Sequence, residues 1–225
     1  MLNLSHLNKE EALRYMGFAG NTPDKVSSAI IDECEVELLK SIRPVYTYEI
    51  FDILHTENGV EVLNTPLLLT GNSAGNHLKG CNKIVLMAAT LGIGADRLIK
   101  KFQVSDLSHA LACDALGSAA IEQVCNIAEE EIKKEVSPLY MTWRFSPGYG
   151  NLPLEIQPDF LTVLSAPKKI GLTITDSLIM LPSKSVTAFI GLSEIPLEKG
   201  RQGCAICKLK ETCNFRKRGE RCAGY

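Results

Sequence analysis

The stretch from Lys83 to Gly92, KIVLMAATLG, constrains the fold of this chain more than any other segment. It is an almost continuous apolar run with the length of one strand, and such a run is typical of a strand in the centre of a sheet. The chain has 225 residues, of which 45% are hydrophobic and 22% charged, so it can bury a sizeable core. This composition excludes a wholly disordered chain.

Helix caps, turns and alternating segments predict further elements around this strand. Asn8 with Glu11 is typical of a helix N-terminus, and the Asn58-Gly59 pair predicts a tight turn. Residues 182–184 separate two alternating segments, a pattern that predicts a hairpin. We predict helices at 8–17, 23–42, 94–102, 105–135 and 154–166, and a short helix with loops within 71–80. We predict strands at 45–54, 83–92, 172–181 and 185–192, and one or two short strands within 60–70. The fold class is therefore expected to be α+β, with a mixed or antiparallel sheet and long helices.

The chain divides into three parts. Residues 1–40 are expected to form an N-terminal helical segment, residues 41–195 the α+β body, and residues 201–225 a small Cys-rich tail. The tail holds seven Lys or Arg side chains and two Asp or Glu side chains. The rest of the chain holds 17 Lys or Arg side chains and 24 Asp or Glu side chains. A basic tail after an acidic body suggests two separable units.

Charge and hydropathy argue against several classes of protein. The net charge is −2, so we do not expect the whole chain to be an electrostatic nucleic-acid binder. No window approaches 18 uninterrupted apolar residues, so no membrane span is expected. The N-terminal segment lacks the basic-then-apolar order of a signal peptide. Eight cysteines without such a signal point to the reducing cytoplasm.

The cysteines fall into two groups. Four are scattered through apolar or helical segments and are interpreted as small core residues: Cys34, Cys81, Cys113 and Cys125. The other four lie in one 19-residue segment inside the basic tail and are predicted to bind metal: Cys204, Cys207, Cys213 and Cys222. Neighbouring cations favour the thiolate form that ligates metals. Four thiolates fit an iron–sulfur cluster or a tetrahedral zinc ion, and unligated thiols are the third alternative.

A candidate ligand-binding turn lies at residues 144–150, Arg-Phe-Ser-Pro-Gly-Tyr-Gly. Arg144 offers a fork of donors for a planar anion, and Gly148 lets a ligand approach the main chain closely. Tyr149 can cover a flat ring or form a hydrogen bond to it. A plain surface turn after a helix would have the same composition, so the residues alone leave both interpretations open.

This turn, together with two later segments, resembles the activation domain of cobalamin-dependent methionine synthase. The later segments are Gly171–Ser177 (GLTITDS) and Met180–Val186 (MLPSKSV). The helix Ala110–Glu131, with its Ala-Leu-Ala-x-Asp-Ala-Leu sequence, also resembles the long helix of that family. The resemblance covers roughly residues 40–195.

The resemblance implies a ligand and the residues that bind it. Arg144, Ser146 and the Gly148-Tyr149 turn are expected to bind S-adenosylmethionine, with the 171–192 segment packed beneath them. Carboxylates near the site favour the sulfonium and ammonium groups. Asp114 and Glu122, about two turns apart on one helix, are the candidates, although a solvated helix face explains them equally well.

The resemblance also implies a function. The chain contains no Asp-x-His-x-x-Gly cobalt-ligating motif, so the cobalamin is expected on a separate methyltransferase or corrinoid protein. The chain would support reductive methylation of that cobalamin, with the tail or a redox protein supplying the electron. Cobalt(I) is itself the nucleophile, so no catalytic residue is assigned, and whether the chain is an enzyme stays open. The alternative is a binding module whose zinc-stabilised basic tail contacts nucleic acid or an acidic protein.

Overall fold

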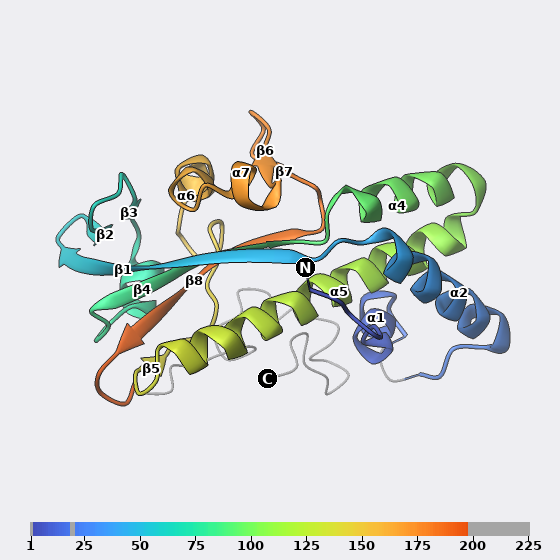
Figure 1. Ribbon diagram of the computed structural model, residues 1–225, viewed down its shortest axis with the longest axis horizontal. Helices are drawn as coiled ribbons and strands as arrows, with labels where there is room; N and C mark the ends of the chain where they lie inside the picture. Colours follow the sequence, from blue (N-terminus) through green and yellow to red (C-terminus); the bar gives the residue numbers. More distant parts are fainter. Residues whose placement is uncertain (1, 19–20, 198–225) are drawn as a thin grey trace.

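The computed structural model describes residues 2–18 and 21–197, which form a six-stranded sheet in the order β3-β2-β1-β4-β8-β5 (Figure 1). The strands of this sheet are β1 (Val45–Thr56), β2 (Gly59–Val62), β3 (Leu68–Leu69), β4 (Lys83–Thr90), β5 (Tyr140–Met141) and β8 (Ser185–Ser193). Neighbouring strands are antiparallel in every described pair. The expected α+β class with long helices is confirmed, and the sheet is antiparallel.

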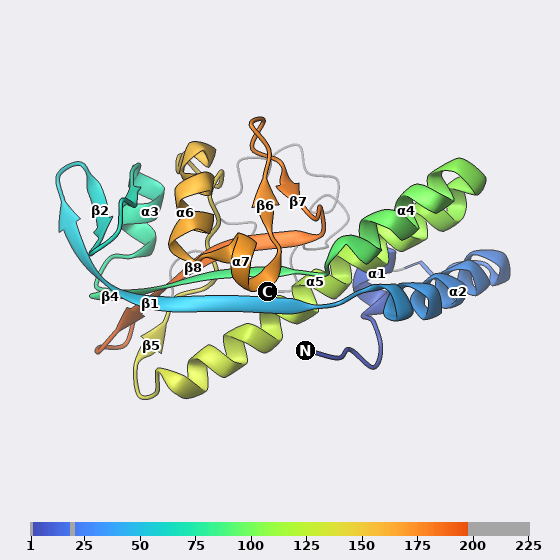
Figure 2. The ribbon, with the colours of Figure 1, turned by 45° about the horizontal axis from the view of Figure 1, so that its top comes forward.

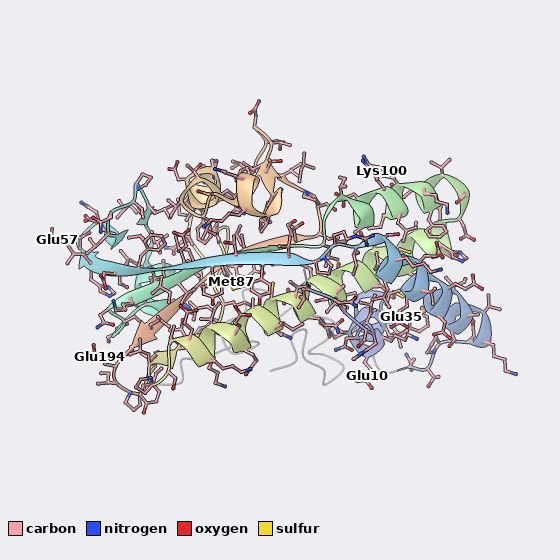
Figure 3. The ribbon with its side chains drawn as sticks, in the orientation of Figure 1. Glu10, Glu35, Glu57, Met87, Lys100 and Glu194 are labelled. Atoms are coloured by element: carbon pink, nitrogen blue, oxygen red, sulfur yellow. The ribbon has the colours of Figure 1, made fainter. Side chains whose placement is uncertain are left out.

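β4 is the central strand that the apolar run predicts. It pairs with β1 on one side and with β8 on the other. Its side chains alternate between two buried clusters, one on each face of the sheet: Val85, Met87 and Ala89 on the α5 side, and Ile84, Leu86 and Ala88 on the other. The label of Met87 in Figure 3 marks the first of these faces. Burial on both faces explains why this strand lacks polar alternation.

Helices cover both faces of this sheet (Figure 2). The long α5 (Leu107–Glu135) runs along one face, and three helices pack against it: α1 (Lys9–Tyr15), α2 (Lys25–Ser41) and α4 (Ile93–Ser105). The other face carries α3 (Asn72–His77), the 3-10 turn η1 (Leu154–Ile156), α6 (Gln157–Val163) and α7 (Ala166–Ile170). Side-chain caps begin α1, α2 and α5, where Asn8, Asp24 and Asp106 accept main-chain N–H groups.

The predicted hairpin between residues 172–181 and 185–192 is wrong. The first segment instead folds on itself, because β6 (Thr173–Ile174) pairs with β7 (Met180–Leu181) as a separate two-stranded sheet. β8 enters the main sheet beside β4. From Thr187 to Ser193 all residues of β8 are buried. Only a strand inside the sheet is covered on both faces, whereas a small surface hairpin would leave one face exposed to solvent.

The helix predicted at 154–166 is broken into η1, α6 and α7. Ser165 adopts a φ of 52°, in the left-handed region, and so ends the helical path between α6 and α7. The four scattered cysteines are buried and unpaired, which confirms their interpretation as core residues. Among the described residues, no helix is long and apolar enough to span a membrane. The predicted tail at 201–225 lies outside the described residues.

Candidate functional site

An open cavity of about 310 Å³ lies beside the edge of the sheet formed by β8, between α5 and α6. It is built from four parts of the chain, and its lining residues are Glu122, Arg144, Ser146, Pro147, Tyr149, Leu154, Gln157, Leu178, Met180, Ser185, Val186, Thr187 and Ala188. The predicted ligand turn therefore forms one wall of a real cavity. Segments far apart in the sequence, α5 and the β7–β8 region, complete it.

Arg144 is held against α5 by three acceptors. Its Nη1 donates to Glu129, and its Nη2 donates to Asn126 at 2.8 Å and to Glu122 at 3.2 Å. The guanidinium side chain is 12% exposed, so two ion pairs with Glu122 and Glu129 fix a largely buried cation at the wall of the cavity. Because those acceptors lie 15 to 22 residues away in sequence, spacing alone gave no indication of Glu129 or Asn126.

The turn after Arg144 is closed by its own main chain. Gly148 N–H donates to Leu152 C=O, and Tyr149 N–H donates to Ser146 C=O. Gly148 has a φ of 86°, a conformation that favours glycine. The Tyr149 ring is 62% exposed and lies edge-on to Phe145, with their centroids 6.1 Å apart. The turn thus presents an aromatic ring and a fixed main chain to the cavity.

The two candidate carboxylates on α5 lie in different environments. Glu122 lines the cavity and contacts Arg144, and its side chain is 45% exposed. Asp114 lies outside the cavity lining and forms a 2.9 Å ion pair with Lys184. Lys184 also donates to Ser118 and precedes the lining residue Ser185, so Asp114 anchors the segment that enters β8. Direct contact between Asp114 and a ligand stays a prediction.

Gln157 is a lining residue for which the sequence carries no recognisable pattern. It is 3% exposed, at the start of α6, and its Nε2 donates to Thr187 Oγ1 at 2.7 Å and contacts Met180 Sδ at 3.2 Å. Its Oε1 is buried and has no hydrogen-bond partner among the described residues. A buried polar atom of this kind calls for an explanation.

A buried histidine lies behind the turn. His77 packs against Trp143, Phe145 and Phe189, with ring centroids 4.5 to 5.7 Å apart. Burial lowers its pKa to about 4, because desolvation disfavours the charged ring. Thr142 Oγ1 accepts from Gly191 N–H and lies 2.8 Å from His77 Nε2. We therefore assign His77 to the packing that supports the candidate ligand-binding turn.

No group of three or more His, Cys, Asp or Glu side chains able to hold a metal ion occurs in residues 2–18 and 21–197. The predicted metal ligands are Cys204, Cys207, Cys213 and Cys222, and all four lie outside those ranges. The metal site of the tail therefore stays a prediction from sequence.

Comparisons with known proteins agree with this architecture. The family model for the activation domain of vitamin B12 dependent methionine synthase matches residues 74–194, more than half of the chain. A solved structure, described as the crystal structure of the MetH reactivation domain bound to AdoHcy, superposes with a TM-score of 0.59. The likeness covers 94% of this chain and 74% of that chain at 17% identity, and it shows a shared fold. No curated protein matches the chain. The matched span of residues places this chain in the family of vitamin B12-dependent methionine synthase activation domains.

Proposed function

We propose that this chain binds S-adenosylmethionine in the cavity beside β8 and supports reductive methylation of a cobalamin held by a separate methyltransferase. The observation that carries the proposal is the meeting of Arg144 and Glu122 at one wall of the cavity. A fixed cation beside a carboxylate is complementary to a zwitterionic amino-acid group, which carries one charge of each sign.

The amino-acid end of the ligand binds by exchange of ion pairs. The Arg144–Glu122 contact is the longer of the two contacts of Nη2, and Glu122 is the more exposed of the paired carboxylates, so it is the partner that a ligand carboxylate displaces. Glu129 keeps Arg144 in position during the exchange. The displaced Glu122 then accepts a hydrogen bond from the ligand ammonium group.

The rest of the ligand faces the turn and the β7–β8 segment. The exposed ring of Tyr149 can lie over a flat ring or beside the sulfonium, where a cation is attracted to an aromatic face. Ser146 lines the cavity and offers a hydroxyl, whereas Gly148 lies outside the lining residues and its positive φ lets the turn form. Leu154 and Met180 add apolar surface.

In this reaction the chain has to hold the methyl donor in the right position. The reduced cobalt of the partner attacks the ligand methyl group, the sulfur–methyl bond breaks, and S-adenosylhomocysteine stays in the cavity. No proton moves, so the chain needs no general base, and its contribution is to hold the sulfonium in one orientation. The openness of the cavity allows a cofactor on another protein to reach the methyl group.

The four tail cysteines extend this proposal. Bound to iron and sulfide, they would form a redox centre on the same chain as the methyl donor, and bound to zinc they would stabilise a docking segment. The basic residues around them favour contact with an acidic partner protein.

Isothermal calorimetry with S-adenosylmethionine and S-adenosylhomocysteine tests the ligand assignment. Arg144→Ala removes a charge-assisted contact, so affinity should fall roughly ten- to hundredfold. Arg97→Ala, on the exposed side of α4, is the matched control and should bind as the wild type does. Absence of binding by the wild type would refute the ligand, and unchanged binding by Arg144→Ala would refute the role of Arg144.

The methylation step is tested with a cobalamin-bearing methyltransferase, a reductant and S-adenosylmethionine. The visible spectrum of the cobalt should change to that of methylcobalamin in the presence of this chain. Arg144→Ala should slow the change, and an equal rate without the chain would contradict the proposed function.

A further inference from the structure

We propose that Gln157 and the uncovered edge of β8 at Thr187 form the part of the cavity that recognises the amino edge of a purine, and so select adenosyl over deaminated ligands. This inference rests on the proposed binding of S-adenosylmethionine, and it names the groups that identify its ring. Two independent observations support it.

The first observation is the orientation of the Gln157 carboxamide. One end of it contacts the Thr187 hydroxyl and the Met180 thioether. A thioether sulfur accepts hydrogen bonds and donates none, so the amide nitrogen is the end that fits there. The amide oxygen is thereby left at the other end, buried and without a partner among the described residues. An unpaired buried acceptor is costly, and a ligand N–H group that donates to it removes that cost.

The second observation is an open stretch of sheet edge. β5 covers only Leu192 and Ser193 of β8, and an isolated bridge joins Phe145 to Phe189. Phe189 exchanges both of its main-chain hydrogen bonds with Phe145, on the outer side of β8. Main-chain groups alternate along an antiparallel strand, so Thr187 directs its N–H and C=O to that same outer side. No described strand covers the edge there, and Thr187 lines the cavity.

These groups match the chemistry of an adenine edge. Adenine presents a donor, its exocyclic amino group, next to an acceptor, its ring N1. Gln157 Oε1 is an acceptor, and the N–H of Thr187 is a donor on the residue whose side chain holds the same carboxamide. The exocyclic amino group donates to Gln157, and N1 accepts from Thr187. Leu154, Leu178 and Met180 supply apolar surface for the ring.

Deamination reverses both groups of that edge. An inosyl ligand carries a carbonyl oxygen in place of the amino group and a proton on N1. The carbonyl would face Gln157 Oε1 and the N1 proton would face the Thr187 N–H, so both contacts become repulsive. The structure therefore predicts a preference for S-adenosylhomocysteine over S-inosylhomocysteine of roughly tenfold or more.

The test measures both ligands by calorimetry on the full chain. Gln157→Leu lacks the acceptor, so its affinity for S-adenosylhomocysteine should fall about tenfold while its affinity for the inosyl analogue changes little. Gln103→Leu, on the exposed face of α4, is the matched control and should behave as the wild type. Thermal melting of each variant verifies that it is folded.

The outcomes separate this inference from the proposed function. If the wild type binds S-adenosylhomocysteine but does not discriminate against the inosyl analogue, only the recognition of the purine edge is overturned. The same holds if folded Gln157→Leu keeps the wild-type ratio, because Gln157 Oε1 then contributes nothing to the discrimination. If the wild type binds neither ligand, the proposed function fails and this inference fails with it.

Discussion

The side-chain oxygen Oδ1 of Asn151 accepts a hydrogen bond from the main-chain N–H of Ser73 across 2.9 Å, and so joins the end of the ligand turn to the start of α3. The Ser73 hydroxyl accepts from Asn151 N–H at 3.3 Å, which makes the contact reciprocal. Gly150, which precedes Asn151 in the chain, has a φ of 60°. A Cβ at Gly150 would lie 2.3 Å from Ser73 Oγ, so the two segments are in close contact.

Asn151→Ala is expected to loosen the ligand turn. The variant loses the side-chain hydrogen bond from Ser73 N–H, worth about 1 kcal/mol of stability, and keeps the one that its own main-chain N–H donates to Ser73 Oγ. Its melting temperature should fall, and its affinity for S-adenosylhomocysteine should fall with it, because the Tyr149 ring loses its fixed position. Asn21→Ala, on an exposed residue remote from the cavity, serves as the control. Wild-type affinity in a destabilised Asn151→Ala would show that the α3 contact does not position the turn.

Glu122 and Glu129 are expected to differ in what they do for the ligand. Glu129→Gln weakens the support of Arg144, so it should reduce binding both of S-adenosylhomocysteine and of its desamino analogue. Glu122→Gln should reduce binding of S-adenosylhomocysteine, by roughly tenfold, and leave the desamino analogue nearly unaffected. Glu130→Gln, on the exposed side of α5, is the control for calorimetry. An equal loss for both ligands in Glu122→Gln would mean that Glu122 does not contact the ammonium group.

The stability of the protein should depend on pH through His77. Its pKa in the folded chain is lowered to about 4 from an ordinary 6.5, because burial disfavours the charged ring. Between these values the unfolded chain binds more protons, so the free energy of unfolding rises with pH across this window and the contribution is complete above pH 6.5. The expected slope is about 1 kcal/mol per pH unit.

Denaturant titrations at pH 5 and pH 7 measure this slope. His77→Phe keeps an aromatic ring among Trp143, Phe145 and Phe189 and cannot titrate, so its slope should be smaller than that of the wild type. Equal slopes in the two proteins would assign the pH dependence to other groups.

The four tail cysteines are expected to bind metal in the full-length chain. Protein purified without oxygen should contain either iron and sulfide, with visible absorption, or zinc without it. Cys207→Ser should lose most of the metal, and Arg144→Ala should keep it, because the cavity and the tail are predicted to act separately. A wild type with neither metal would leave unligated thiols as the correct interpretation of the sequence.

The N-terminal 200 residues are expected to fold without the tail. Among the described residues, the buried members of both hydrophobic clusters lie between Leu4 and Leu192, so we expect removal of residues 201–225 to leave cooperative melting largely unchanged. Loss of the melting transition on truncation would show that the body and the tail form one unit.

Sequence alone predicted the elements whose determinants are local. The apolar run at 83–92 became β4, and the segment 105–135 became α5, because strand length, helical periodicity and the Asp106 cap are all encoded within a few neighbouring residues. The motif that places Arg144 close to Gly148 and Tyr149 also predicted a turn at residues 144–150, and its role in ligand binding stays a prediction.

Only the tertiary structure decided where those elements meet. Alternation at 185–192 predicted a strand correctly, but its pairing with β4 instead of residues 172–181 depends on burial against both faces of the sheet. Glu129 and Asn126 reach Arg144 from α5, and Gln157 reaches Thr187 across 30 residues of chain. Local sequence fixes the conformation of a segment through its own main chain and caps, whereas the partner of a side chain is set by packing between segments that are distant in sequence.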